Sequence, residues 1–98
     1  MDDEHLYIVT YDIADPRRWR AVFKLMHGYG EWLQLSVFQC RLVRRRQVEM
    51  LARLELAIRP AEDHVMIIDV GLAENAEPRV RSLGKRPFEA ITRDPVIV

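Results

Sequence analysis

The stretch from Leu6 to Arg18 limits the possible folds more than any other part of the chain. Residues 6 to 11 are apolar, β-branched or aromatic, which is the composition of a strand packed on both faces. Asp15 and Pro16 then form a helix-start signal, because Asp15 can cap free N–H groups and a proline at the first helical position loses no hydrogen bond. The sequence therefore predicts a central strand followed closely by a helix, with an acid, Asp12, at the carboxyl end of the strand.

The segment from Pro16 to Tyr29 has the period of an amphipathic helix. Its apolar residues recur with the spacing of one buried helix face, and they are Trp19, Val22, Phe23 and Met26. Basic residues occupy another face, and they are Arg17, Arg20, Lys24 and His27. Gly28 and Gly30 are expected to end the helix, since either glycine can adopt the left-handed cap conformation.

The middle of the chain contains a second group of regular elements. Residues 31 to 42 are rich in strand formers and are interpreted as two short strands turning near Ser36, with one long bent strand as the alternative. A second helix is predicted from Arg44 to Ile58 and is stopped by Pro60. Its predicted inward residues are Val48, Leu51, Leu54 and Ile58, and its predicted charge pairs are Glu49 with Arg53 and Glu55 with Arg59.

The last part of the chain begins with another apolar strand. This strand is predicted from His64 to Val70 and is closed by Gly71. A turn is expected at residues 75–78 and a short strand at residues 79–83, while the apolar end, residues 96–98, is expected to dock, for example as a strand added to another chain. The order strand, helix, strand pair, helix, strand predicts an α+β fold, a ferredoxin-like βαββαβ sandwich with an extra C-terminal strand, in a single domain over residues 1–98.

Composition narrows the functional classes only moderately. The 98 residues carry no formal net charge, so charge alone does not indicate nucleic-acid binding, although basic residues gather locally. The single cysteine, Cys40, excludes an internal disulfide or a zinc knuckle. An acidic N-terminus and the absence of a long apolar run predict a cytoplasmic protein without a membrane span.

Asp12 is the strongest candidate for chemistry. It adjoins a predicted helix start that carries Arg17, Arg18 and Arg20, and an acid beside phosphate-binding groups suggests metal-assisted phosphodiester chemistry. A purely structural role at a turn is an equally open interpretation of the same carboxylate. Mg²⁺, or Mn²⁺ in its place, needs only one or two carboxylates, so a homodimer in which two copies of Asp12 face each other could complete the site.

For most of the other candidate residues a purely structural role is an alternative to the functional one. Arg44 and Arg45 could bind nucleic acid, because basic residues at a helix start oppose the helix dipole and need another reason to be there. Tyr11 and Phe38 could stack on bases or simply pack in the core, and Ser36 could bind a phosphate or close a turn. Asp15 is interpreted as a helix cap. The histidines His5, His27 and His64 are scattered, with no metal-ligand spacing and no partner nucleophile.

Three motifs together carry a family resemblance. Y-D-I-A-D-P-R-R follows the first strand, Y-G-E-W-L-Q-L-S-V-F-Q-C follows the first helix, and D-H-V-M-I-I-D-V follows the second. In order and spacing, from Leu6 to about Val70, the chain resembles the CRISPR-associated Cas-two family. Trp32 and Gln39 depart from the residues common in that family, and at Trp32 the departure removes a positive charge that could contact a phosphate.

The resemblance implies a ferredoxin-like homodimer of the spacer-acquisition module, which associates with the CRISPR integrase (Cas-one) and acts as a divalent-metal-dependent endonuclease on RNA or duplex DNA. It implies that Asp12 binds the metal, with Tyr11 as its neighbour and Ser36 and Phe38 as the S-V-F motif of the site. Arg17 and Arg18 match the family's basic residues. It also implies that the C-terminal segment, about residues 79–98, crosses onto the partner subunit.

Two alternatives of a different kind stay open at this point. The chain could be a non-catalytic dimeric adaptor that bridges integrase dimers and holds duplex DNA on its basic residues, with Asp12 idle. It could also be a toxin-like ribonuclease, related in fold to the virulence-associated D proteins. A domain that binds a small regulatory ligand is the least favoured, since no residues mark a specific pocket.

Overall fold

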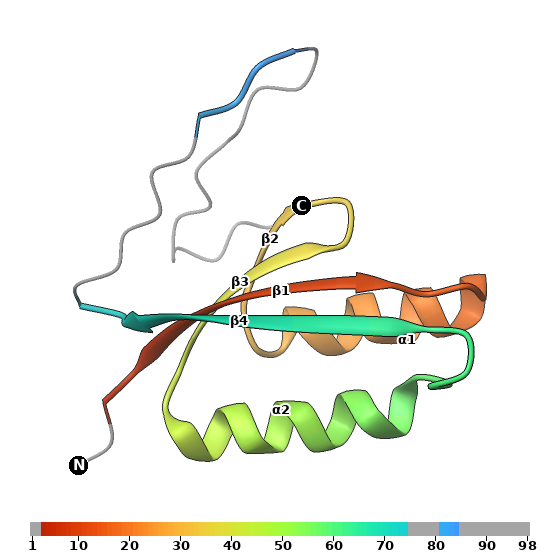
Figure 1. Ribbon diagram of the computed structural model, residues 1–98, viewed down its shortest axis with the longest axis horizontal. Coiled ribbons are helices and arrows are strands. Elements are labelled where there is room, and N and C mark those ends of the chain that lie inside the picture. The colour runs from red at the N-terminus through yellow and green to blue at the C-terminus, as the bar shows by residue number, and fades with distance from the viewer. Residues whose placement is uncertain (1–2, 75–80, 85–98) are drawn as a thin grey trace.

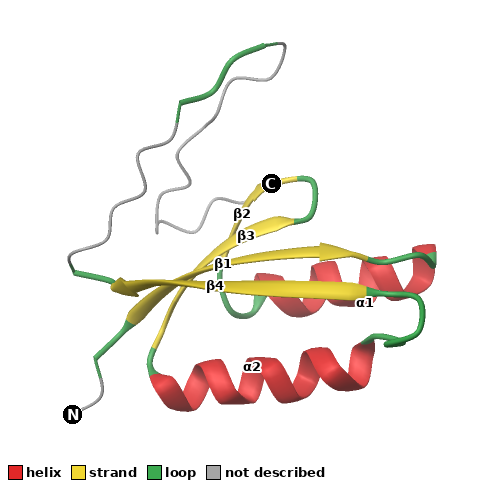
Figure 2. Ribbon diagram, viewed as in Figure 1, coloured by secondary structure: helices red, strands yellow, loops and turns green. Residues whose placement is uncertain are grey.

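The computed structural model describes residues 3–74 and 81–84. Its elements in chain order are β1 (His5–Asp12), α1 (Pro16–His27), β2 (Glu31–Gln34), β3 (Val37–Leu42), α2 (Arg44–Ala57) and β4 (His64–Leu72). The strands form one antiparallel sheet in the order β2-β3-β1-β4. This is the predicted ferredoxin-like order, and it confirms two strands rather than one in residues 31–42. The sheet twists across both helices, which cover one of its faces (Figures 1 and 2).

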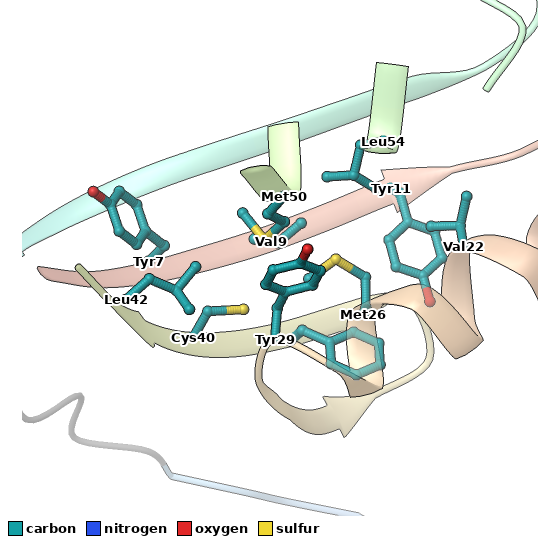
Figure 3. Packing of buried hydrophobic residues seen from close by; sticks show 11 residues of the cluster. Tyr7, Val9, Tyr11, Val22, Met26, Tyr29, Cys40, Leu42, Met50 and Leu54 are labelled. Atoms are coloured by element: carbon teal, nitrogen blue, oxygen red, sulfur yellow. The ribbon is translucent and has the colours of Figure 1, made fainter. Parts of the chain in front are cut away.

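The core lies between the sheet and the two helices. Along β1 the residues that face the helices, Tyr7, Val9 and Tyr11, are buried, whereas Ile8 and Thr10 on the other face are half-exposed. Figure 3 shows the three buried side chains of β1 in the core cluster with residues of α1, α2 and β3. The alternation fixes which side chains can form a site on the open face, because a strand turns successive side chains to opposite faces.

Cys40 lies in this core and is fully buried. Burial raises the pKa of its thiol to about 12. The thiol is therefore protonated at neutral pH and serves as a small packing group.

The predicted inward face of α2 is confirmed at Leu54 and Ile58 but is wrong at Val48. Val48 is 53% exposed, and the buried residues of the helix are Met50 and Leu54. At about 100° per residue Val48 lies roughly 200° around the helix from Met50, so the two cannot share a face. The predicted pair of Arg53 with Glu49 is present at 3.9 Å, whereas Arg59 pairs with Glu62 at 2.9 Å instead of with Glu55.

The glycines also behave differently from the prediction. Gly28 caps α1 with φ −79° and ψ −10°, which is right-handed rather than left-handed. A Cβ on Gly30 would lie 2.4 Å from both Cys40 Sγ and Gln39 O, so this glycine is required by close packing of the loop on β3. Gly71, with φ +112°, lies within β4 beside a register shift and does not close the strand.

The predictions for the C-terminal part of the chain fall only partly within the described residues. Residues 81–83 do not form a strand, so the predicted strand at residues 79–83 is wrong over that part. The predicted turn at residues 75–78, the apolar tail and residues 79–80 lie outside the described residues. No helix among the described residues is long and apolar enough to cross a membrane.

Candidate metal and nucleic-acid site

Asp12 is the last residue of β1, and its side chain is exposed. It belongs to the open face of the sheet, since its neighbour Tyr11 points into the core. Within residues 3–74 and 81–84 the carboxylate takes part in no hydrogen bond or ion pair, so both oxygens are available to a ligand. Across the β1–β4 ladder its direct partner is His64, the first residue of β4.

The turn after Asp12 is fixed by the helix cap that the sequence predicts. Asp15 Oδ2 accepts hydrogen bonds from the backbone N–H groups of Arg17 and Arg18, each at 3.0 Å. The hydrogen bond from the Arg18 N–H, and to a smaller extent the one from Arg17, lowers the pKa of Asp15. The capping interpretation of Asp15 is confirmed, and the cap leaves Asp12 as the acid without partners in this turn.

Asp63 is a second acid at this end of the sheet, and no local sequence pattern marks it as a site residue. Its side chain is buried, and it accepts hydrogen bonds from the backbone N–H groups of Ala14 at 3.0 Å and Arg59 at 2.8 Å. Arg18 completes the set, with Nε 2.8 Å from Oδ2 and a terminal nitrogen 3.1 Å from Oδ1. The Arg18 guanidinium, followed by the two backbone donors, holds the pKa of Asp63 well below its usual range. Asp63 therefore ties the β1–α1 loop to the start of β4.

This arrangement changes the interpretation of Arg18. Its guanidinium also lies 3.5 Å from Glu62, and its side chain is 20% exposed. Arg18 is thus engaged inside the fold, and its predicted contact with phosphate stays a prediction that would require it to serve two purposes. Arg17 and Arg20 are exposed on the outer side of the same helix end and have no such commitment among the described residues.

Tyr11 and Ser36 meet beside Asp12. The Tyr11 backbone N–H donates to Ser36 O at 3.2 Å, and Ser36 Oγ accepts a hydrogen bond from Trp19 Nε1 at 3.0 Å. The Tyr11 hydroxyl is buried and makes no hydrogen bond of ordinary geometry within the described residues. Burial raises the pKa of Tyr11 to about 12, with the Ser36 side chain acting in the opposite direction. The phenol is therefore protonated at neutral pH, and Tyr11 serves to hold the end of β1 rather than to accept a proton.

Phe38 is fully buried and packs against other rings. Its ring centroid lies 6.3 Å from that of Tyr11 and 5.7 Å from that of Phe23. Such a side chain cannot stack on a base without unfolding the core, so base stacking by Phe38 is excluded. Its contribution to the site is to support Tyr11.

The predicted basic residues divide between two ends of the molecule. Arg17 and Arg20 lie in the first turns of α1, next to the end of β1 (Figure 1). Arg44 and Arg45 are exposed at the start of α2, after β3, whose last residue Leu42 pairs with His5 at the opposite end of β1. The structure therefore brings Arg17 and Arg20 to Asp12 and places Arg44 and Arg45 away from it.

Contacts within the fold explain the presence of one basic residue at the start of α2, Arg46. Its guanidinium carbon lies 4.4 Å from the centroid of the Tyr29 ring, and it pairs with Glu49. A terminal nitrogen also donates to Gly28 O at 3.1 Å. Arg46 therefore joins the two helix ends, and only its neighbours Arg44 and Arg45 still need an external explanation.

A divalent metal is compatible with the donor set at Asp12 but is not fully held by it. A carboxylate with free oxygens on an open face is the ligand that Mg²⁺ and Mn²⁺ prefer. Among residues 3–74 and 81–84, however, no group of three or more His, Cys, Asp or Glu side chains is placed to hold a metal. Asp12 could thus anchor the ion, with water, phosphate or a second chain supplying the other ligands.

The fold and this open acid define a ferredoxin-like domain with a free carboxylate beside a helix start that carries exposed arginines. Residues 5–77 match the family described as CRISPR associated protein Cas2. The chain belongs to this family, which confirms the resemblance carried by its three motifs.

Close relatives span nearly the whole chain. A protein of Geobacter sulfurreducens named CRISPR-associated endoribonuclease Cas2 is 59% identical over 95 residues, which cover 97% of this chain and 99% of that protein. A Rhodospirillum rubrum protein named CRISPR-associated endoribonuclease Cas2 1 is 54% identical and is covered over 92% of its length, again with 97% of this chain.

Solved structures agree with the fold. A hypothetical protein from Thermus thermophilus has a TM-score of 0.73 and 32% identity, with 86% of this chain and 98% of that chain covered. Cas2 from Streptococcus pyogenes, crystallised at pH 6.5, has a TM-score of 0.69 and 33% identity, with 81% of this chain and 99% of that chain covered. The fold is therefore shared with both solved structures, one of which is a Cas2 protein.

Proposed function

We propose that this chain is a cytoplasmic, divalent-metal-dependent endonuclease that hydrolyses phosphodiester bonds in CRISPR spacer acquisition. The observation that carries the proposal is the free, exposed carboxylate of Asp12 at the end of β1, next to the exposed Arg17 and Arg20. Relatives named endoribonuclease support RNA as the first substrate to examine, with duplex DNA as the second.

The roles of the residues follow from their places. Asp12 would hold Mg²⁺ or Mn²⁺, and the bound ion would supply an activated water and neutralise charge on the phosphate. Arg17 and Arg20 would bind backbone phosphates and set the position of the strand. The contact of Tyr11 with Ser36 keeps the end of β1, and so Asp12, in place.

The assembly is also part of the proposal. A homodimer would bring a second Asp12 to the metal, which one chain needs because its described residues hold no complete ligand set. Residues 79–98 would pack on the partner subunit, and the dimer would associate with the CRISPR integrase.

Cleavage assays with the full chain test the proposal. Wild type should cleave an RNA oligonucleotide or a DNA duplex with Mg²⁺ or Mn²⁺ and stop when EDTA removes the metal. Asp12→Asn should reduce the rate at least about 100-fold, since the metal is worth several kcal/mol. The matched control is Asp69→Asn, an exposed acid on β4 near the other end of the ladder, which should cleave like wild type.

The adaptor is the second candidate, and the incomplete ligand set favours it. In that case neither wild type nor Asp12→Asn would cleave, while both would bind duplex DNA equally and with strong salt dependence. Cleavage by Asp12→Asn at the wild-type rate would reject the enzymatic proposal. Spacer acquisition by Asp12→Asn in cells would separate the biological role from the nuclease activity.

A further inference from the structure

Asp12 has a histidine as its direct neighbour on the adjacent strand. In the antiparallel β1–β4 ladder Asp12 is paired with His64, and both side chains are exposed. Residues directly opposite each other on such a ladder point to the same face, with Cβ atoms about 4.5–5.5 Å apart. That spacing allows one oxygen and one imidazole nitrogen to reach a common cation with bonds of about 2 Å.

The face of the sheet is the same for both residues. On β4 the exposed residues His64, Met66 and Ile68 alternate with Val65 and Ile67, which pack against the core. On β1 Asp12 alternates with the buried Tyr11. The imidazole and the carboxylate therefore both belong to the face of the sheet opposite the core. Figure 2 shows that the two helices lie on the other side of the sheet.

A second His–Asp pair, near the other end of the same two strands, is hydrogen-bonded to itself and serves as a comparison. His5 Nδ1 lies 2.9 Å from Asp69 Oδ1 and 3.0 Å from Asp69 Oδ2. Asp69 Oδ1 also accepts a hydrogen bond from the Gly71 N–H, and the His5 contact followed by this bond lowers the pKa of Asp69. His5 Nδ1 and both carboxylate oxygens of Asp69 are therefore already engaged in hydrogen bonds. Asp12 and His64 form no hydrogen bond or ion pair within the described part of the chain, so their carboxylate oxygens and ring nitrogens are available.

The geometry points to His64 as a second protein ligand of the divalent cation at Asp12, which gives each chain one oxygen and one nitrogen donor. This inference rests on the proposed metal binding by Asp12. Imidazole is a poor ligand for Mg²⁺ but a good one for Mn²⁺, Co²⁺, Ni²⁺ and Zn²⁺, whose affinities for a nitrogen-containing site generally rise along the first transition row as far as copper. His64 therefore selects for a transition-metal ion over Mg²⁺.

Calorimetric titration of the full-length chain tests this assignment. The chain must be free of any histidine tag, because such a tag would itself bind the metals. NiCl₂, MnCl₂ and MgCl₂ are titrated separately into wild type, His64→Gln and Asp12→Asn. The control is His5→Gln, which removes the histidine at the opposite end of β1. Circular dichroism and Tm establish that each variant is folded.

We expect His64→Gln to weaken Ni²⁺ binding at least about tenfold and to change Mg²⁺ binding by less than about twofold. Asp12→Asn should weaken the binding of both ions, whereas His5→Gln should change the binding of neither. Mn²⁺ should also broaden the NMR signals of the His64 ring protons in wild type before those of His5.

Three results would overturn the assignment. If His64→Gln binds Ni²⁺ like wild type while Asp12→Asn does not, His64 is not a ligand, although the proposed role of Asp12 survives. If neither substitution changes binding, or if wild type binds none of the three ions, both the ligand assignment and the proposed metal site are wrong. Equal losses for Ni²⁺ and Mg²⁺ in His64→Gln would also contradict it, since the selectivity would then have another source.

Discussion

Asp12 and Asp63 lie at the same end of the sheet, yet their surroundings are opposite. Asp63, one residue before β4, is buried and accepts hydrogen bonds from two backbone N–H groups and from Arg18. Asp12, at the end of β1, is exposed, and its side chain makes no hydrogen bond or ion pair with any of the described residues. One carboxylate is fully used by the fold, and the other is used by nothing in it.

The difference separates a structural acid, Asp63, from the acid that we propose as the functional one, Asp12. A buried carboxylate is retained because removing it strands the donors around it. An exposed carboxylate without partners contributes little to folding, so its presence at a strand end beside exposed arginines is better explained by a ligand. The comparison predicts that substitutions at the two positions have effects of different kinds.

The largest expected effect is on thermal stability. Asp63→Asn removes the charge that holds Arg18 and should lower Tm by at least about 10 °C, because breaking a buried ion pair in a domain of this size is strongly destabilising. Asp12→Asn should change Tm by less than about 4 °C, as is usual for an exposed site. Thermal unfolding followed by circular dichroism measures both. Equal shifts would remove the distinction between the two acids.

Acid unfolding sharpens the same result. The pKa of Asp63 is lower in the folded chain than its unfolded value of about 3.9, so its ionised form stabilises the fold above that pH. This contribution is lost as the pH falls below about 4 toward the folded value. Urea unfolding of Asp63→Asn should therefore show a weaker fall of stability with acid than wild type. An identical pH dependence would mean that Asp63 is not the acid responsible.

The sequence predicted the local features of this end of the molecule and missed the contacts between distant segments. Asp15 followed by Pro16 is a signal within a few residues, so the cap and the start of α1 could be predicted from chemistry alone. The set around Asp63 joins residues 14, 18, 59 and 63, and no local pattern indicates that these meet. The pairing of Asp12 with His64 has the same origin, since it depends on the β1–β4 register.

Val48 was wrongly assigned to the inward face of α2 for a different reason, whereas Leu54 and Ile58 were assigned to it correctly. Both Val48 and Met50 are apolar, and periodicity alone does not decide which of two apolar stripes faces the sheet. Packing selected the stripe with Met50, whose side chain is fully buried in the cluster formed with β1 and β3. Gly30 is similar, because its requirement arises from the approach of the loop to Cys40 and not from its own backbone angles.

Arg17 and Arg18 allow a smaller test of the same comparison. Arg18→Gln weakens the Asp63 set and should lower Tm by roughly 6–12 °C, since the hydrogen bonds lost to a charged group are worth at least about 1.5 kcal/mol and each kcal/mol shifts Tm by about 4–8 °C. Arg17→Gln should leave Tm unchanged, weaken polynucleotide binding and reduce the slope of log affinity against log salt by about 1. Fluorescence anisotropy at several salt concentrations measures the slope. Interchanged phenotypes would show that Arg18, and not Arg17, is the phosphate ligand.

Trp19, whose indole N–H donates to Ser36, provides the smallest and most local test. Trp19→Phe keeps an aromatic ring next to Phe23, whose centroid lies 5.0 Å away, but removes the Nε1–H that binds Ser36 Oγ. The loss should cost about 1 kcal/mol. Because Ser36 O is the acceptor for the Tyr11 N–H, exchange of that amide hydrogen should accelerate by up to about fivefold, while the acid unfolding that depends on Asp63 stays unchanged.

Trp32→Phe is the matched control for this exchange measurement. Trp32 Nε1 donates to Leu35 O at 2.9 Å, in the same turn but one residue further from the contact with Tyr11. Its loss should affect the Tyr11 amide less than the loss of the Trp19 donor does. If both variants accelerate exchange equally, the turn opens as a unit and Ser36 has no separate part in holding Asp12. If only Trp19→Phe does, the free acid owes its position to a backbone contact, whereas the buried acid owes its position to its own hydrogen bonds.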